Sequence, residues 1–105
     1  MAKRINKKVI GTVKKYLAEV GKDYQIEGAF LFGSYANGTE HAESDIDVAI
    51  LLAKIENRYK ERINLSRYTW NIDSRIEPHP IRTDEYMNNS SILASEIIRN
   101  GIRIA

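Results

Sequence analysis

The chain has 105 residues, of which 43% are hydrophobic and 29% charged, and its formal net charge at pH 7 is +2. This length and composition predict one globular domain over residues 1–105 and exclude a disordered, collagen-like or coiled-coil chain. Cysteine is absent, which excludes disulfides, thiolate metal sites and thiol nucleophiles, and the apolar runs are far shorter than the ~20 residues of a membrane span.

The first predicted element is a basic amphipathic helix over residues 3–20. Its apolar residues recur every four positions, at Ile5, Val9, Val13 and Leu17. The basic residues of this segment favour a solvated helix surface over a nucleic-acid interface, because no aromatic residue stands among the lysines before Tyr16. No apolar core of a signal peptide follows the basic N-terminus, so we expect a cytoplasmic protein without a membrane contact.

Two strands and a loop are predicted next. Residues 28–32 form a short, wholly apolar run that is typical of a strand buried on both faces. Residues 33–44 are polar and contain two glycines, which predicts a loop with room for one helical turn near residues 34–36. The second strand is expected over residues 45–53, with an apolar inner half.

The second half of the chain begins with a predicted helix over residues 55–70. Its expected core-facing residues are Ile55, Tyr59, Ile63 and Trp70. A third strand is predicted over residues 75–81. Pro78 and Pro80 lie two residues apart, so their missing N–H groups face the same side and place this strand at a sheet edge or beside a loop.

A last helix over residues 90–100 and a short strand over residues 102–105 complete the predicted chain. The apolar residues of this helix are Ile92, Leu93, Ile97 and Ile98. The order is therefore α-β-β-α-β-α, with an optional terminal strand. It predicts an α/β (α+β) fold in which helices flank a small mixed sheet.

Asp45 and Asp47 are the first candidate site residues. Residues i and i+2 of a strand point to the same face, so these carboxylates are expected side by side at the start of an apolar strand. A divalent cation such as Mg²⁺ or Mn²⁺ would relieve their repulsion. The alternatives are a polar strand entrance and a calcium loop, and the glycine that a calcium loop requires is missing.

Gly33 and Ser34 form the second candidate feature, directly after the first apolar strand. A glycine at a sharp turn lets a phosphate approach the backbone, and the serine hydroxyl with the following N–H groups can donate hydrogen bonds to it. The alternative is a plain turn. The pattern is neither a Walker A loop nor a dinucleotide-binding glycine motif.

Together these features resemble the nucleotidyltransferase superfamily of the DNA polymerase β type. Its pattern is an apolar strand, Gly-Ser or Gly-Gly, a loop of about this length, and Asp-x-Asp flanked by apolar residues. Ala36, Gly38 and Ser44 also match the fuller signature of the minimal nucleotidyltransferase group. The resemblance implies the nucleotidyltransferase fold in a single minimal domain.

The family implies a third carboxylate from a later strand, and Glu77 is the expected residue, with Asp73 as the alternative. The family's usual residue at this place is aspartate. The resemblance implies that Asp45, Asp47 and Glu77 are catalytic and hold Mg²⁺ or Mn²⁺. Gly33 and Ser34 would then bind the phosphates of a nucleoside triphosphate, with ATP as the expected donor.

The implied reaction is transfer of a nucleoside monophosphate, AMP if the donor is ATP, to a hydroxyl group. Members of the minimal group often pair with a helical HEPN-domain toxin and act as its antitoxin, and some transfer AMP to a tyrosine of the toxin. The expected partner is thus a HEPN-type chain, or a second copy of this one.

The alternatives are a non-catalytic binding module and a nucleic-acid binder that uses the basic N-terminal helix. The intact Gly-Ser and Asp-x-Asp motifs favour the enzyme, and the carboxylates disfavour nucleic acid.

Five further residues are weaker candidates. His79 shares the face of Glu77 and is weighed as a substrate contact, whereas His41 is expected to be exposed in the loop. Tyr35 is a weak candidate for a position near the nucleotide base. Arg58 and Arg62 share a helix face, and a solvated surface is favoured over a role in binding phosphate or an acidic partner.

Overall fold

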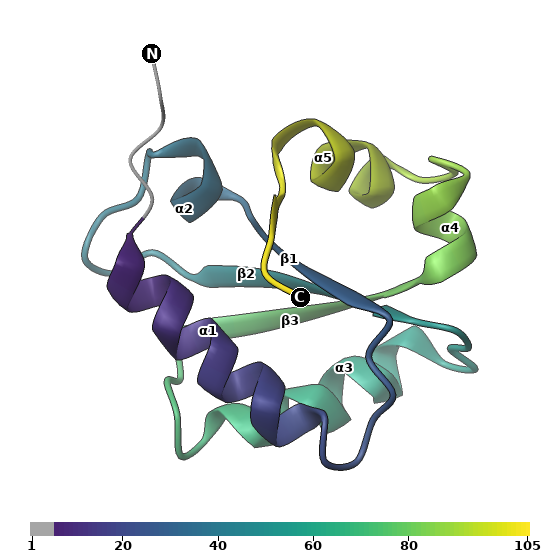
Figure 1. Ribbon diagram of the computed structural model, residues 1–105, viewed down its shortest axis with the longest axis horizontal. Coiled ribbons are helices and arrows are strands. Elements are labelled where there is room, and N and C mark those ends of the chain that lie inside the picture. Colours follow the sequence, from purple (N-terminus) through teal and green to yellow (C-terminus); the bar gives the residue numbers. More distant parts are fainter. Residues whose placement is uncertain (1–5) are drawn as a thin grey trace.

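The computed structural model describes residues 6–105. The helices are α1 (Lys7–Val20), α2 (Ser34–Asn37), α3 (Arg58–Ser66), α4 (Thr83–Met87) and α5 (Ile92–Asn100), with a 3-10 turn, η1 (Arg67–Thr69), after α3. The strands are β1 (Gly28–Phe32), β2 (Ile46–Leu52), β3 (Ile76–Arg82) and β4 (Ile102–Arg103). This arrangement (Figure 1) confirms the predicted fold class and element order. Helix α4 was not expected, and Ile5 of the predicted first helix lies outside the described residues.

The four strands form one mixed sheet in the order β3-β2-β1-β4. Strand β1 is antiparallel to β2 and to β4, whereas β2 and β3 run parallel. A parallel pair needs a crossover connection, which α3 supplies here. Among the described strands β3 lies at one edge of the sheet, as its two prolines predict.

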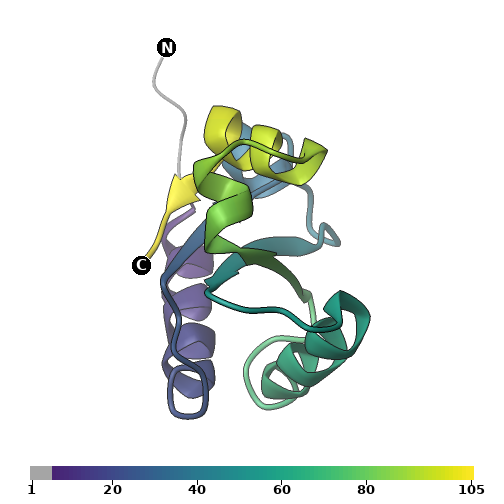
Figure 2. The same ribbon diagram turned by 90° about the vertical axis from the view of Figure 1, so that its right-hand side faces the viewer.

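Helices cover both faces of the sheet (Figures 1 and 2). Helices α1 and α3 pack on one face, over the β2 residues Ile46, Val48 and Ile50. Helices α4 and α5 pack on the other, over Ala49 and Leu51. Apolar side chains are therefore needed on both sides of β1 and β2, which explains why their runs do not alternate with polar residues.

The predicted core face of the third helical segment is wrong at three of its four residues, whereas Ile55 packs against the core as predicted. Tyr59 is 74% exposed, Trp70 is 78% exposed and Ile63 is 39% exposed, whereas Leu65 is fully buried. Leu65 packs in the core on the α1 side, and its backbone oxygen accepts a 2.8 Å hydrogen bond from the Tyr16 hydroxyl. The helix begins at Arg58 and meets the sheet beside β3, so that Leu65 and not the aromatic residues faces the core.

The last helix is also less buried than its sequence suggests. Ile97 is buried in the second core cluster, but Ile92 is 89% exposed and Ile98 is 47% exposed. The buried residues of α5 are Ala94 and Ile97, and α4 packs beside this helix and against β2 and β3. Within residues 6–105 no helix has both the length and the apolar character that crossing a membrane requires.

Candidate active site

Gly33 joins β1 to α2 and lies against a candidate carboxylate. Its backbone has φ of +74° and ψ of −150°, a combination open to glycine and closed to almost every other residue. A Cβ atom at this position would lie 2.3 Å from Oδ2 of Asp47. The glycine therefore allows both the turn and the close approach of the Asp47 carboxylate to the backbone.

Ser34 opens the short helix α2, and the following loop leads to Asp45. The helix ends at Gly38, which has φ of +74° and ψ of 20°. The loop is held by the buried Ser44, whose hydroxyl oxygen accepts a 2.8 Å hydrogen bond from the backbone N–H of His41. The His41 side chain is exposed, as expected.

The two aspartates differ in their surroundings. Asp47 lies within β2, between Phe32 of β1 and Glu77 of β3, and its side chain is 24% exposed. Asp45 lies just before the first residue of β2 and is exposed. The strand itself therefore holds Asp47 more firmly than Asp45.

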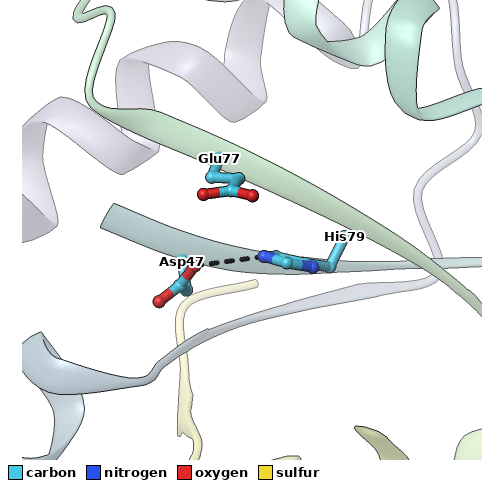
Figure 3. Close-up of side chains that lie close together, drawn as sticks. All are labelled: Asp47, Glu77 and His79. Atoms are coloured by element: carbon cyan, nitrogen blue, oxygen red, sulfur yellow. Dashed lines mark hydrogen bonds and ion pairs between the residues drawn. The ribbon is translucent and has the colours of Figure 1, made fainter. Parts of the chain in front are cut away.

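A cluster of three possible metal ligands forms on one face of β2 and β3 (Figure 3). Asp47, Glu77 and His79 each offer one ligand atom, and these atoms lie within 4.8 Å of one another. Nε2 of His79 lies 3.1 Å from Oδ1 of Asp47. Among the described residues, Asp45 contributes no atom to this cluster.

Glu77 has a cationic neighbour from another element. Its Oε1 atom forms an ion pair with the guanidinium of Arg62 in α3, and the Glu77 side chain is 35% exposed. The Arg58 guanidinium pairs with the buried carboxylate of Glu85. Arg58 and Arg62 are both exposed, as expected of a solvated helix face, and each also pairs with a carboxylate on a different element.

Asp73, the alternative third carboxylate, lies in a separate ion pair. It accepts hydrogen bonds of 2.9 Å from the backbone N–H of Arg75 and of 2.8 Å and 3.1 Å from the Arg75 guanidinium. These side-chain hydrogen bonds hold the pKa of Asp73 below its usual range. The same guanidinium donates a 3.1 Å hydrogen bond to the hydroxyl of Tyr35. Tyr35 is 4% exposed and packs in the core, so the interpretation that places it at a nucleotide base is wrong.

Two open hollows meet at Asp45. One, of about 390 Å³, is lined by Ser34, Asp47 and the loop before β2. The other, of about 420 Å³, is lined by α3, including Tyr59 and Arg62, and by the start of β3, including Glu77. The arrangement offers a polar, carboxylate-lined hollow beside a hollow with cationic and aromatic walls.

Two contacts of this site were not predicted from the sequence. They are the Arg62–Glu77 ion pair and the contact between His79 and Asp47. The spacing of Glu77 and His79 predicts a shared face, but their distance from Asp47 depends on the parallel register of β2 and β3. No signal in the sequence indicates which helix residue meets Glu77, because α3 packs against β3 through tertiary contacts alone.

Residues 12–105 match the sequence family described as "Polymerase beta, Nucleotidyltransferase". The chain is 37% identical over 73 residues to a Methanocaldococcus jannaschii protein assigned by inference as a protein adenylyltransferase, a match that covers 67% of this chain and 73% of that protein. It is 29% identical over 72 residues to the protein adenylyltransferase MntA of Shewanella oneidensis. This second match covers 69% of this chain and 48% of MntA, so the chain spans about half the length of that relative.

Solved structures share the same architecture. A chain from Sulfolobus solfataricus, assigned by inference as a nucleotidyltransferase, superposes with a TM-score of 0.68 at 19% identity. The superposition covers 91% of the present chain and 78% of the Sulfolobus chain. A chain of a toxin–antitoxin crystal structure with AMP-PNP superposes with a TM-score of 0.67 at 25% identity, covering 91% and 72%. A chain from the structure of the tri-AMPylated HEPN toxin of Shewanella oneidensis in complex with the MNT antitoxin superposes with a TM-score of 0.60 at 20% identity. This superposition covers 94% of the present chain and 71% of the other.

Proposed function

The chain belongs to the polymerase β-type nucleotidyltransferase family as a member of its minimal group, and from that premise we propose that it transfers AMP from ATP to a hydroxyl group of a partner protein. The observation that carries the proposal is the register of β2 and β3. It pairs Asp47 with Glu77 directly across the strands, while the Gly33 backbone lies against the Asp47 carboxylate. We further propose that residues 1–105 act as one minimal domain and that ATP is used in the cytoplasm.

The proposed roles follow from the position of each side chain. The Gly33 and Ser34 backbone and the Ser34 hydroxyl would donate hydrogen bonds to the phosphates of ATP in the hollow that contains Asp45 and Asp47. Glu77 stands at the second hollow, from which the acceptor would enter, and its carboxylate would accept the proton of the acceptor hydroxyl. The acceptor oxygen then bonds to the α-phosphorus as the bond to the bridging oxygen breaks, and pyrophosphate leaves.

The donors present fit a divalent cation. The Asp47 and Glu77 carboxylates and the His79 imidazole converge in the structure, and Asp45 and Asp47 line one hollow. Asp45, Asp47 and Glu77 would hold Mg²⁺ or Mn²⁺, in line with the preference of these cations for carboxylate oxygens. When bound, the cation supplies positive charge that offsets the negative charge on the triphosphate and the leaving pyrophosphate.

A protein acceptor is supported by the relatives and by the surface of α3. The two curated relatives are named protein adenylyltransferases, and two of the structural neighbours come from toxin–antitoxin structures. In this chain, Tyr59 and Ile63 are exposed and line the hollow that reaches Asp45 and Glu77. We propose that a HEPN-type toxin docks here and presents a tyrosine to the site, and that the chain acts as its antitoxin.

The experiment incubates the chain with ATP and Mg²⁺, with and without the product of the neighbouring gene as the candidate partner. Label should reach the partner from α-labelled ATP and not from γ-labelled ATP, because AMP is transferred and pyrophosphate is lost. Asp47→Asn and Glu77→Gln should abolish the labelling. Asp84→Asn is the matched control, because Asp84 pairs with Arg82 on an exposed surface outside the site.

Three outcomes would contradict parts of the proposal. Transfer that is unchanged in Asp47→Asn would refute the enzyme. Partner binding without any label transfer would favour the binding module. Loss of transfer in Asp73→Asn with full activity in Glu77→Gln would reassign the third carboxylate.

A further inference from the structure

We infer that His79 is a nitrogen ligand of the divalent cation in this site, and that it makes the site prefer Mn²⁺ to Mg²⁺. The inference rests on the proposed function to the extent that a cation is needed there. It starts from the ligand atoms that the structure brings together, which belong to Asp47, Glu77 and His79. This donor set is two carboxylates and one imidazole, whereas the sequence predicts three carboxylates.

The spacing of the donors suits a shared ion. Two atoms that bind one cation at about 2.1 Å and at right angles lie about 3.0 Å apart. Nε2 of His79 and Oδ1 of Asp47 lie 3.1 Å apart, and a Glu77 oxygen lies within 4.8 Å of both. The first separation corresponds to neighbouring positions around one ion, and the Glu77 oxygen lies close enough to both atoms for a side-chain adjustment to bring it to the same ion.

The backbone and its neighbours hold the imidazole in this position. His79 stands between Pro78 and Pro80, whose rings restrict the backbone on both sides. Its partner across the strands is Ala49, a small residue that leaves the ring space to lean toward Asp47. The ring also packs edge-on against Phe32, with centroids 5.0 Å apart and planes inclined by 68°.

The burial and charge of the cluster favour coordination over a surface contact. The side chains of Asp47 and His79 are 24% and 22% exposed, so both are mostly buried. Arg62 already pairs with one Glu77 oxygen, Oε1. A neutral imidazole adds a ligand to the pair of carboxylates without adding negative charge, and imidazole binds transition metals better than it binds Mg²⁺.

The test is pulsed electron paramagnetic resonance of the full chain with Mn²⁺, without nucleotide or acceptor. The wild-type protein should show ¹⁴N modulation from a directly bound imidazole, and His79→Gln should abolish it. His41→Gln is the matched control, because the chain has two histidines and the exposed His41 lies outside the ligand cluster. In calorimetric titrations His79→Gln should weaken Mn²⁺ binding by about 10-fold to 100-fold and Mg²⁺ binding by less than about 3-fold.

A wild-type measurement keeps the test independent of the folding of the variant. Titration of ¹⁵N-labelled protein with ¹¹³Cd²⁺ should produce a one-bond coupling on Nε2 of His79. Mn²⁺ that binds without ¹⁴N modulation, modulation that survives in His79→Gln, or ¹¹³Cd²⁺ bound without the coupling would overturn the inference. These readouts need no AMP transfer, so an imidazole-bound ion in a protein without transferase activity would refute only the proposed function. AMP transfer by a protein whose bound cation has only oxygen ligands would refute only the role of His79.

Discussion

Replacing Gly33 by alanine is expected to destabilise the fold and to slow AMP transfer about 100-fold, because the position has two separate requirements for glycine. The first is its backbone, with φ of +74° and ψ of −150°, which other residues adopt at a cost of about 1–3 kcal/mol. The second is space, because the new Cβ atom would lie 2.3 Å from Oδ2 of Asp47.

The size of the effect follows from both requirements. Contacts of a Cβ atom below 3.0 Å essentially never occur, so the Asp47 carboxylate has to move by at least about 0.7 Å. Backbone strain and overpacking together should cost about 3 kcal/mol, which lowers the melting temperature of a domain of this size by about 15 °C. A displacement of this order in a positioned catalytic group can reduce the rate about 100-fold.

Gly38→Ala is the matched control. Gly38 has the same φ of +74°, but nothing lies within 4 Å of a Cβ atom placed there. Its replacement should therefore cost only the backbone strain, about 1 kcal/mol, and leave transfer near the wild-type rate. The assays are urea unfolding, thermal melting and label transfer from α-labelled ATP. The reasoning would be refuted by a Gly33→Ala protein as stable and active as the wild type, or by equal losses in the two variants.

Three further predictions concern the core and its ion pairs. Tyr16→Phe removes a hydrogen bond to the buried Leu65 carbonyl and should lower the free energy of unfolding by about 1 kcal/mol in urea titrations. Leu65→Ala should lower it by about 3 kcal/mol, whereas Trp70→Ala should change it by less than about 0.5 kcal/mol, and acrylamide should readily quench Trp70 fluorescence in the native protein. Burial raises the pKa of the Glu85 carboxyl, but the hydrogen bonds from the Arg58 guanidinium prevail and hold this pKa below its ordinary value of 4.5. The resulting stabilisation is present above pH 4.5 and is lost as the pH falls through the lowered folded value. Arg58→Met should therefore cost about 1–2 kcal/mol at pH 7 and less in acid, which urea unfolding at both pH values would measure.

Local features of the sequence suffice to predict part of the fold and part of the candidate site. The apolar runs of β1 and β2 predict strands covered on both faces, and the two prolines of β3 predict an edge, because both inferences depend on one segment at a time. The same holds for the Gly33-Ser34 turn and for the face of Asp47, which follow from backbone conformation and from the alternation of side chains along a strand.

Only the tertiary structure decides which residues meet. The face of α3 depends on how the helix packs beside β3, so a periodic pattern that suggested Tyr59 and Trp70 for the core missed Leu65. The parallel register of β2 and β3 places Glu77 and His79 near Asp47 and leaves Asp45 outside the ligand cluster. Strand pairing joins segments that are about 30 residues apart in the chain, and no local pattern encodes their relative shift. The sequence by itself therefore predicts the carboxylates and the phosphate-binding turn, whereas the imidazole in the ligand cluster is a consequence of how the strands pair.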